Sequence, residues 1–303
     1  MAENPFEAEG NWYRGNLHTH TTVSDADLPP EQMCEVYREA GYDFLFITDH
    51  NRVADVSGLS SDDFLVLPGA ELSGRAGERY CDLVSLNITG LPEVPGPHDP
   101  ANEVIASVRA MGGEVILAHP YDLLSADALG LQAIPGLPGI LGLEVYNHSV
   151  HMNIRRGLAV QHWDALLARG RRALGFATDD SHYHFNDFRP NDVCGGWVTV
   201  RAPELSGPAI LEAIRDGMFF ASTGPGFEDL QLTASSATAR TDRPCRSITF
   251  VGPTWATSRS FTPLDGSLIS EAEFDLRENQ TYVRVECLAE NGSMAWTQPI
   301  WVE

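Results

Sequence analysis

Short apolar runs alternate with amphipathic stretches from about residue 12 to residue 221. Apolar runs bounded by polar residues are typical of buried strands, whereas apolar positions three or four residues apart are typical of helices. The pattern predicts strands at residues 14–20, 44–48, 64–71, 82–88, 114–118, 142–146, 173–178 and 197–201. It predicts helices at residues 30–40, 102–111, 153–168 and 208–216. Alternating strands and helices of this kind indicate an α/β architecture.

The pattern changes after residue 226, where no helical period of useful length is found. Short alternating runs, separated by Gly, Pro, Asn and Asp, predict strands at residues 229–233, 247–251, 281–288 and 297–302. Residues 234–241 are predicted to form an exposed loop. These features favour a small antiparallel β-sandwich. We therefore expect an N-terminal domain at residues 1–225 and a C-terminal β domain at residues 226–303, with the Gly-Pro-Gly element at residues 224–226 as the hinge.

Composition places the chain among ordinary globular proteins, because 43% of its residues are hydrophobic and 20% are charged. The first ten residues are acidic and polar, and no apolar run is long enough to cross a bilayer. We therefore expect a cytoplasmic protein without a membrane partner. The five cysteines are scattered and form no C-x-x-C pair, which predicts reduced thiols rather than a disulfide framework.

The formal net charge of -22 limits the possible partners. A protein that binds nucleic-acid polymers along their phosphate backbone needs a basic field, and this chain contains no lysine. A small-molecule substrate is therefore favoured over a nucleic-acid polymer. Part of the negative charge can be local, because a carboxylate metal site carries excess acid until its cations are counted.

Two histidines, His18 and His20, stand one residue apart at the end of a predicted strand. Alternate residues of a strand point to the same side, so both imidazoles can bind one metal ion. For an isolated pair of this kind, two hydrogen-bonded core histidines are the alternative interpretation.

Other apolar strands also end in side chains that can bind metals. After the strand ends at residues 48, 70, 118 and 178, the next residues include Asp49 with His50, Glu71, His119, and the segment from Asp179 to His182. Hydrogen-bonded core histidines explain any one of these positions but not the recurrence at five strand ends. In β/α barrels the catalytic groups lie at the carboxyl ends of the strands. Nitrogen and oxygen donors without thiolates suit zinc, manganese or iron, and the donor set does not choose among them.

In this order, the motifs LHTH, TTVSD, FITDHN, PGAE, LAHP and TDDSH resemble the polymerase and histidinol phosphatase (PHP) family of metal-dependent phosphoesterases. The resemblance covers roughly residues 18–224. It implies a distorted (β/α)7 barrel whose site holds two or three divalent metal ions. With the C-terminal strands, the expected fold is a PHP-type barrel followed by a small antiparallel β-sandwich.

The resemblance also implies a set of ligands. One ion is expected on His18, His20, Glu71 and Asp180, with Glu71 bridging to a second ion on His119, and a third ion on Asp25, His50 and His182. Asp180 is preferred to Asp179 because the family pattern is D-x-H. Where many relatives have a histidine about eleven residues after the motif glutamate, this chain has Asp82. Asp82 as a ligand would favour harder metals such as manganese over zinc, and a strand-end salt bridge is the alternative.

Residues that contact the substrate are less well defined. Asn147 and His148 end a strand similar to one whose end lies near the substrate in the family. Either residue could contact the substrate or complete the shell of a metal ion, although a capping Asn is an equally ordinary interpretation of Asn147. His184 is a candidate to assist the leaving alkoxide. A guanidinium group suits bidentate contact with phosphate, although most exposed arginines only keep a surface soluble. The arginines considered for this role are Arg52, Arg75, Arg79, Arg155 and Arg156.

The family resemblance implies a phosphoesterase that cleaves a small phosphomonoester or phosphodiester with a metal-activated water in a site of two or three ions. Two alternatives stay open. One is a metal-dependent carbamate or carboxylic ester hydrolase on the same scaffold. The other is a non-catalytic metal-binding domain. The sequence leaves open the natural substrate, the metal and the oligomeric state.

Overall fold

The computed structural model describes residues 4–77, 79–93, 99–120, 136–184 and 191–302. Its N-terminal part is a mixed α/β structure, as expected. The strands of this part are β1 (Asn11–Asn16), β2 (Phe44–Ile47), β3 (Leu65–Ala76), β4 (Arg79–Leu86), β5 (Glu114–Leu117), β6 (Gly142–Asn147), β7 (Leu174–Thr178), β8 (Trp197–Ala202) and β9 (Phe219–Ser222). The helices are α1 (Pro30–Glu39), α2 (Ala101–Ala110), α3 (His148–Ile154), α4 (Val160–Leu167) and α5 (Gly207–Arg215).

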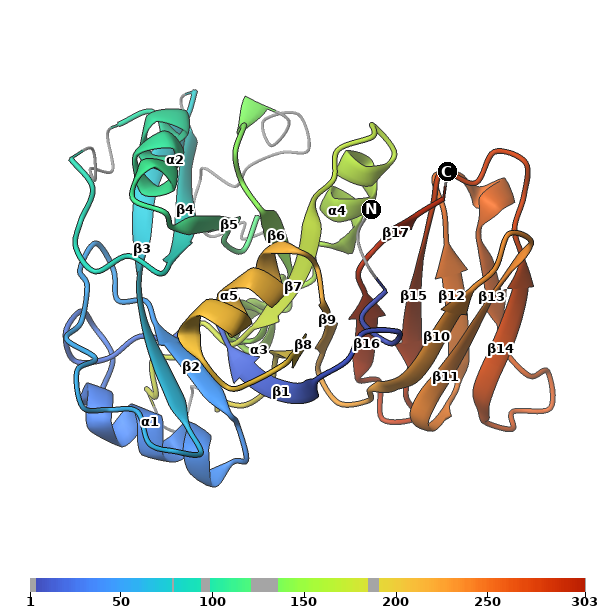
Figure 1. The fold of residues 1–303 in the computed structure, drawn as a ribbon, viewed down its shortest axis with the longest axis horizontal. Helices are drawn as coiled ribbons and strands as arrows, with labels where there is room; N and C mark the ends of the chain where they lie inside the picture. The colour runs from blue at the N-terminus through green and yellow to red at the C-terminus, as the bar shows by residue number, and fades with distance from the viewer. Residues whose placement is uncertain (1–3, 78, 94–98, 121–135, 185–190, 303) are drawn as a thin grey trace.

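The C-terminal part consists mainly of strands, and Figure 1 shows them, in orange to red, at one end of the molecule with α1 and α2 at the other. They are β10 (Phe227–Leu232), β11 (Ser236–Cys245), β12 (Ser247–Val251), β13 (Arg259–Phe261), β14 (Ile269–Asp275), β15 (Tyr282–Leu288), β16 (Met294–Thr297) and β17 (Ile300–Trp301). A 3-10 helix, η2 (Trp255–Thr257), lies between β12 and β13. The prediction of a loop at residues 234–241 was wrong, because β11 is the central strand of a sheet.

Within the described residues, one sheet runs in the order β13-β12-β15-β16-β9-β8-β1-β2-β3-β4-β5-β6-β7. The strands β1, β2 and β3 are parallel, as are β5, β6 and β7. Between these two sets β4 is antiparallel to both of its neighbours. The beginning of β4 therefore lies at the same edge of the sheet as the carboxyl end of β3.

The segments that follow β1 and β7 meet at this edge. A parallel bridge joins Thr19 to Ser181, and the His20 amide donates to the Ser181 carbonyl over 2.9 Å. A single bridge rather than a ladder makes this connection in the described residues. The (β/α)7 barrel therefore stays a prediction, while the approach of the two segments brings their side chains together.

The strand β2 shows how the sheet is buried. Its four residues, Phe44 to Ile47, are all fully buried, as expected for a parallel strand covered on both faces. Phe44 and Phe46 join one apolar cluster, whereas Leu45 and Ile47 pack with Met33 and Tyr37 of α1. This alternation fixes which face each side chain of the strand occupies. The polar residues that follow β2 are therefore held by a rigid element.

The C-terminal strands form two layers, but one layer continues the main sheet. Antiparallel pairing of β16 with β9 joins the two parts of the chain. The second sheet, β10-β11-β14, packs against this layer, with the rings of Phe250 and Phe274 5.5 Å apart. A separate β-sandwich is therefore not established, and the domain boundary after residue 225 stays a prediction.

The prediction of a single helix at residues 153–168 was wrong, because the structure has two helices, α3 and α4, in this region. Arg155 has a left-handed backbone with φ of 61°, which ends α3. A Cβ at Gly157 would lie 2.0 Å from the Asn147 carbonyl oxygen, so only glycine fits where the chain folds back. None of the described helices is both long and apolar enough to cross a bilayer.

Candidate metal centre

The predicted ligands come from six separate segments that meet at one edge of the sheet. His18 and His20 follow β1, His50 follows β2, and Glu71 lies within β3. The antiparallel direction of β4 brings Asp82 to this edge, paired with Ser73 of β3. The remaining ligands follow strands β5 and β7 or lie in the loop after β1: His119, Asp180, His182 and Asp25.

The most buried group contains His18, His20, Glu71 and Asp180, and its donor atoms lie within 4.8 Å of one another. The His20 Nε2 atom is 3.1 Å from His18 Nε2, 3.0 Å from Asp180 Oδ1 and 3.3 Å from Glu71 Oε2. Within the described residues, the buried Glu71 Oε2 accepts no hydrogen bond of acceptable geometry. Three imidazole nitrogens surround this oxygen, with His50 Nδ1 at 2.8 Å and the Nε2 atoms of His18 and His20 at 3.3 Å. A buried carboxylate needs positive charge close by, which protonated histidines or a bound cation supply. These donors therefore fit a divalent ion.

The second group contains Glu71, Asp82 and His119. His119 Nε2 lies 3.1 Å from Glu71 Oε1, on the other side of the carboxylate from Oε2. Ser73 Oγ donates to Asp82 Oδ1 over 3.0 Å, which orients the aspartate. The two oxygens of Glu71 thus face two different groups of donors. This arrangement is what a carboxylate bridging two ions requires.

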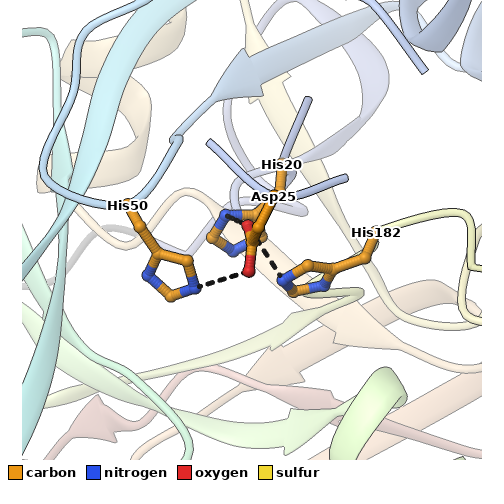
Figure 2. A group of neighbouring side chains, drawn as sticks. All are labelled: His20, Asp25, His50 and His182. Atoms are coloured by element: carbon orange, nitrogen blue, oxygen red, sulfur yellow. Dashed lines mark ion pairs between the residues drawn. The ribbon is translucent and has the colours of Figure 1, made fainter. Parts of the chain in front are cut away.

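The third group, shown in Figure 2, contains His20, Asp25, His50 and His182. Asp25 lies between the rings, 3.8 Å from His50 Nε2, 3.6 Å from His182 Nε2 and 4.0 Å from His20 Nδ1. A neutral imidazole has only one nitrogen with a free lone pair. If His20 binds through Nε2 in the most buried group, its Nδ1 carries the proton and faces Asp25. The donors left for a third ion are those of Asp25, His50 and His182.

The charges of these groups shift one another's pKa values. Burial alone would lower the pKa of His119 and of His50, but Glu71 raises them to about 10 and about 9. Burial lowers the pKa of His20 to about 4. Burial would raise the pKa of Glu71, but the histidines around it, His18 first, hold it well below its ordinary value. Protons on histidine therefore balance the carboxylates in the metal-free protein, and divalent ions would replace these protons.

Two carboxylates support the centre in roles that the sequence did not predict. Asp49 accepts hydrogen bonds from the amides and hydroxyls of Thr21 and Ser24, which fixes the loop that carries Asp25. Glu144 accepts a hydrogen bond from His18 Nδ1 over 2.7 Å. Asp49 directly precedes the predicted ligand His50, and this position could have indicated its supporting role. Glu144 lies inside an apolar strand, and its partner is 126 residues away.

The candidates for substrate contact have different surroundings. Asn147 caps α3 by accepting from the Val150 amide over 3.0 Å, and its side-chain amide donates to Asp180 Oδ2 over 3.2 Å. His148 Nδ1 lies 2.8 Å from the Tyr146 hydroxyl, and His148 is in none of the three groups. His184 Nδ1 is 3.1 Å from Asp27 Oδ2, and its ring lies 5.4 Å from that of His182.

The structure links none of the five candidate arginines to the three groups, as far as the described residues extend. The Arg75 guanidinium lies over the Tyr80 ring, 4.6 Å from its centre, in the hairpin of β3 and β4. The other four are exposed, and they are Arg52, Arg79, Arg155 and Arg156. Their contact with phosphate stays a prediction.

Comparison with known proteins finds no matching family model and no matching curated protein. A solved two-domain protein from Bacteroides vulgatus, which contains a predicted PHP-like metal-dependent phosphoesterase, superposes with a TM-score of 0.51 at 15% identity. The match covers 96% of this chain and 95% of that protein. The chain has a PHP-like fold. The resemblance drawn from the motifs is thus confirmed for the fold, and the likeness to this two-domain protein extends over the C-terminal strands.

Two further solved structures match the chain over a shorter stretch. A Bifidobacterium adolescentis protein proposed to be a metal-dependent phosphoesterase has a TM-score of 0.47 at 16% identity. The match covers 59% of this chain and 92% of the Bifidobacterium protein. An amidohydrolase from Chromobacterium violaceum, solved with sulfate and no metal, has a TM-score of 0.43 at 14% identity. That match covers 58% of this chain and 92% of the amidohydrolase chain.

Proposed function

We propose that the protein is a metal-dependent hydrolase of a small phosphomonoester or phosphodiester. The observation that carries the proposal is the position of Glu71. This buried carboxylate turns one oxygen toward His119 and the other toward His18 and His20. A carboxylate with histidine donors on both sides is the core of a site for two or more ions. The PHP-like fold supports the same class of reaction.

The three groups of donors would hold two or three divalent ions, with zinc, manganese and iron as the candidates. When bound, such ions lower the pKa of water and neutralise charge on phosphoryl oxygens. The first ion would be held by His18, His20, Glu71 and Asp180, the second by Glu71, Asp82 and His119, and the third by Asp25, His50 and His182.

Exposure indicates the side from which substrate reaches the site. The side chains of His18, His20 and Glu71 are fully buried, whereas those of Asp25 and His50 are 53% and 38% exposed. Substrate would therefore approach over the third group. The large negative net charge supports a small substrate over a nucleic-acid polymer.

His184 is the proposed proton donor to the leaving alkoxide. Its side chain is 24% exposed and its ring lies beside that of His182 at the open side of the centre. Asp27 near Nδ1 would orient the ring so that Nε2 faces the leaving oxygen. Among the arginines, Arg52 follows His50 by two residues and is the first to test for phosphate contact.

A metal-dependence assay with a panel of leaving groups tests the proposal. The purified protein is stripped with EDTA, analysed for metals, and reloaded separately with zinc, manganese and iron. We expect hydrolysis of nitrophenyl phosphate or bis-nitrophenyl phosphate only after reloading, and loss of that hydrolysis in Glu71→Gln. Full phosphatase activity in metal-free protein would refute the proposal. Turnover of nitrophenyl acetate alone would favour the carboxylic ester or carbamate alternative, and tight metal binding without any turnover would favour a non-catalytic domain.

A further inference from the structure

Glu144 of β6 is a buried carboxylate that belongs to none of the three donor groups. Its Oε1 atom accepts from His18 Nδ1 over 2.7 Å and from Thr178 Oγ1 over 2.6 Å. Its Oε2 atom accepts from Asn147 Nδ2 over 2.8 Å and from the His119 amide over 2.7 Å. Two of the four donors belong to the proposed ligands His18 and His119, and Asn147 also donates to Asp180. A carboxylate with this many donors holds one fixed orientation.

The bond to His18 determines which nitrogen faces the metal site. An ionised carboxylate only accepts hydrogen bonds, so His18 Nδ1 must carry the proton. In the neutral ring that would bind an ion, the lone pair is then on Nε2, which lies 3.3 Å from both Glu71 Oε2 and Asp180 Oδ1. Histidines that bind metals are commonly oriented in this way through their other ring nitrogen. Glu144 therefore fixes both the tautomer and the ring direction of His18.

The second oxygen acts on the neighbouring group. His119 has a φ of 22°, a conformation that residues other than glycine adopt at a cost. The hydrogen bond from its amide to Glu144 Oε2 stabilises that backbone, and the side chain then reaches Glu71. The side-chain amide of Asn147 donates to Glu144 Oε2 and also to Asp180 Oδ2. Glu144 is thereby connected to Asp180, a third candidate ligand.

We propose that Glu144 is a positioning residue that aligns the ligands of two neighbouring metal ions at the same time. The inference rests on the proposed function only in requiring that the centre binds divalent ions. It does not depend on which ester is cleaved. The substitution Glu144→Gln tests it, because glutamine offers one acceptor oxygen where four donors converge. At least one imidazole or amide donor then faces the side-chain NH2 group.

Co²⁺ binding gives a readout that does not require turnover. We expect Glu144→Gln to bind Co²⁺ about 10 to 100-fold more weakly than the wild-type protein, with a changed visible absorption spectrum. Thr178→Val removes one hydrogen bond to the same carboxylate and leaves every ligand in place. It should weaken Co²⁺ binding in the same direction by a smaller factor.

Glu114→Gln is the matched control, because it makes the same change to a buried carboxylate of the adjacent strand β5. Glu114 pairs with Arg109 and Arg215 and contacts none of the donor groups. We expect Glu114→Gln to lower the thermal stability while the Co²⁺ affinity and spectrum stay those of the wild type.

Wild-type affinity and spectrum in Glu144→Gln would overturn the inference, as would an equal loss in Glu114→Gln. If circular dichroism shows that Glu144→Gln does not fold, Thr178→Val decides, and unchanged Co²⁺ binding in that variant overturns the inference. Phosphatase activity is measured separately. Co²⁺ binding that follows these expectations without phosphoester turnover would support Glu144 as a positioning residue and refute the proposed function. A wild-type protein that binds no divalent ion would refute both.

Discussion

Asp179 and Asp180 are adjacent in the chain, but their carboxylates serve different parts of the molecule. Asp179 accepts from the Tyr37 hydroxyl over 2.7 Å and from the amides of residues 194–196 over 2.7 to 2.8 Å. Asp180 Oδ1 instead lies 3.0 Å from His20 Nε2. Asp180 has a left-handed backbone with φ of 56°, and the side chains of Asp179 and Asp180 therefore point in different directions. Asp179 therefore supports the fold, and Asp180 belongs to the candidate metal centre.

Asparagine substitutions at these two positions should have separable effects. Asp180→Asn removes a proposed ligand, so we expect metal affinity to fall by at least about tenfold. Asp179→Asn weakens buried hydrogen bonds and should lower the free energy of unfolding by about 1–3 kcal/mol. Metal titration and urea unfolding of the metal-free proteins measure both. Greater loss of metal in Asp179→Asn than in Asp180→Asn would reverse the assignment.

The ion pair of Arg284 and Asp164 joins β15 to α4, and with it the C-terminal strands to the N-terminal part. Arg284 is fully buried, 2.6 Å from Asp164 and 3.2 Å from Glu286, with its guanidinium over the Trp163 ring. Asp164→Ala leaves the buried Arg284 with Glu286 as its remaining charged partner. Because Asp164 is 41% exposed, we expect this substitution to lower the free energy of unfolding by about 1–3 kcal/mol.

Urea unfolding measures that loss, and an exposed pair of the same chemistry is the control. Arg240 and Glu228 lie 2.8 Å apart, and both side chains are about half exposed. Glu228→Ala should therefore cost less than about 1 kcal/mol. Equal losses in Asp164→Ala and Glu228→Ala would show that the buried pair does not hold the two parts together.

The sequence was sufficient for features that depend on neighbouring residues. A buried run such as Phe44 to Ile47 and the polar residues that follow it are local, so the strand and the position of His50 were predictable. The direction of β4, and hence the place of Asp82 at the same edge, depends on a hairpin that the pattern only partly indicated. The barrel and the ligand roles came from the family resemblance, and the ligand roles stay predictions.

Features that depend on distant partners were not predictable. Glu144 looks like a charged interruption of an apolar strand until His18 is placed beside it. In β11, Ala237 and Ala239 are fully buried, but alanine has a low preference for strands, so the segment resembled a loop. The pairing of β9 with β16 joins segments about seventy residues apart, and no pattern within either segment indicates it.

Asp82 should control which metal occupies the second group. Asp82→Ala removes one oxygen donor beside Glu71 and His119, and we expect it to lower the bound metal by about one ion per chain. Asp82→His replaces the carboxylate with imidazole, which should shift the preference from manganese toward zinc. Metal analysis after dialysis against equal zinc and manganese measures both effects. Unchanged occupancy in Asp82→Ala would reject Asp82 as a ligand and favour the salt-bridge interpretation.

Metal uptake should depend on pH, because protons occupy the same histidines. Despite burial, Glu71 raises the pKa of His119 to about 10 and of His50 to about 9, above the ordinary 6.5. Both rings therefore carry protons at neutral pH in the metal-free protein and must lose them to bind an ion. Despite burial, the pKa of His18 is raised as well, by Asp180 first among its neighbours. We therefore expect Mn²⁺ binding at pH 7.5 to release at least about two protons and to strengthen as pH rises toward 9.

Calorimetric titration in buffers of different ionisation enthalpy measures the released protons, and His119→Gln should reduce their number by about one. Metal binding strengthens as pH rises, whereas the stability of the metal-free protein should fall. Because the folded pKa values are raised, this contribution is complete below about pH 6.5 and is lost as pH rises through about 9 to 10. Proton release that is near zero, with metal affinity constant from pH 6.5 to 9, would show that these histidines are neutral before metal binds.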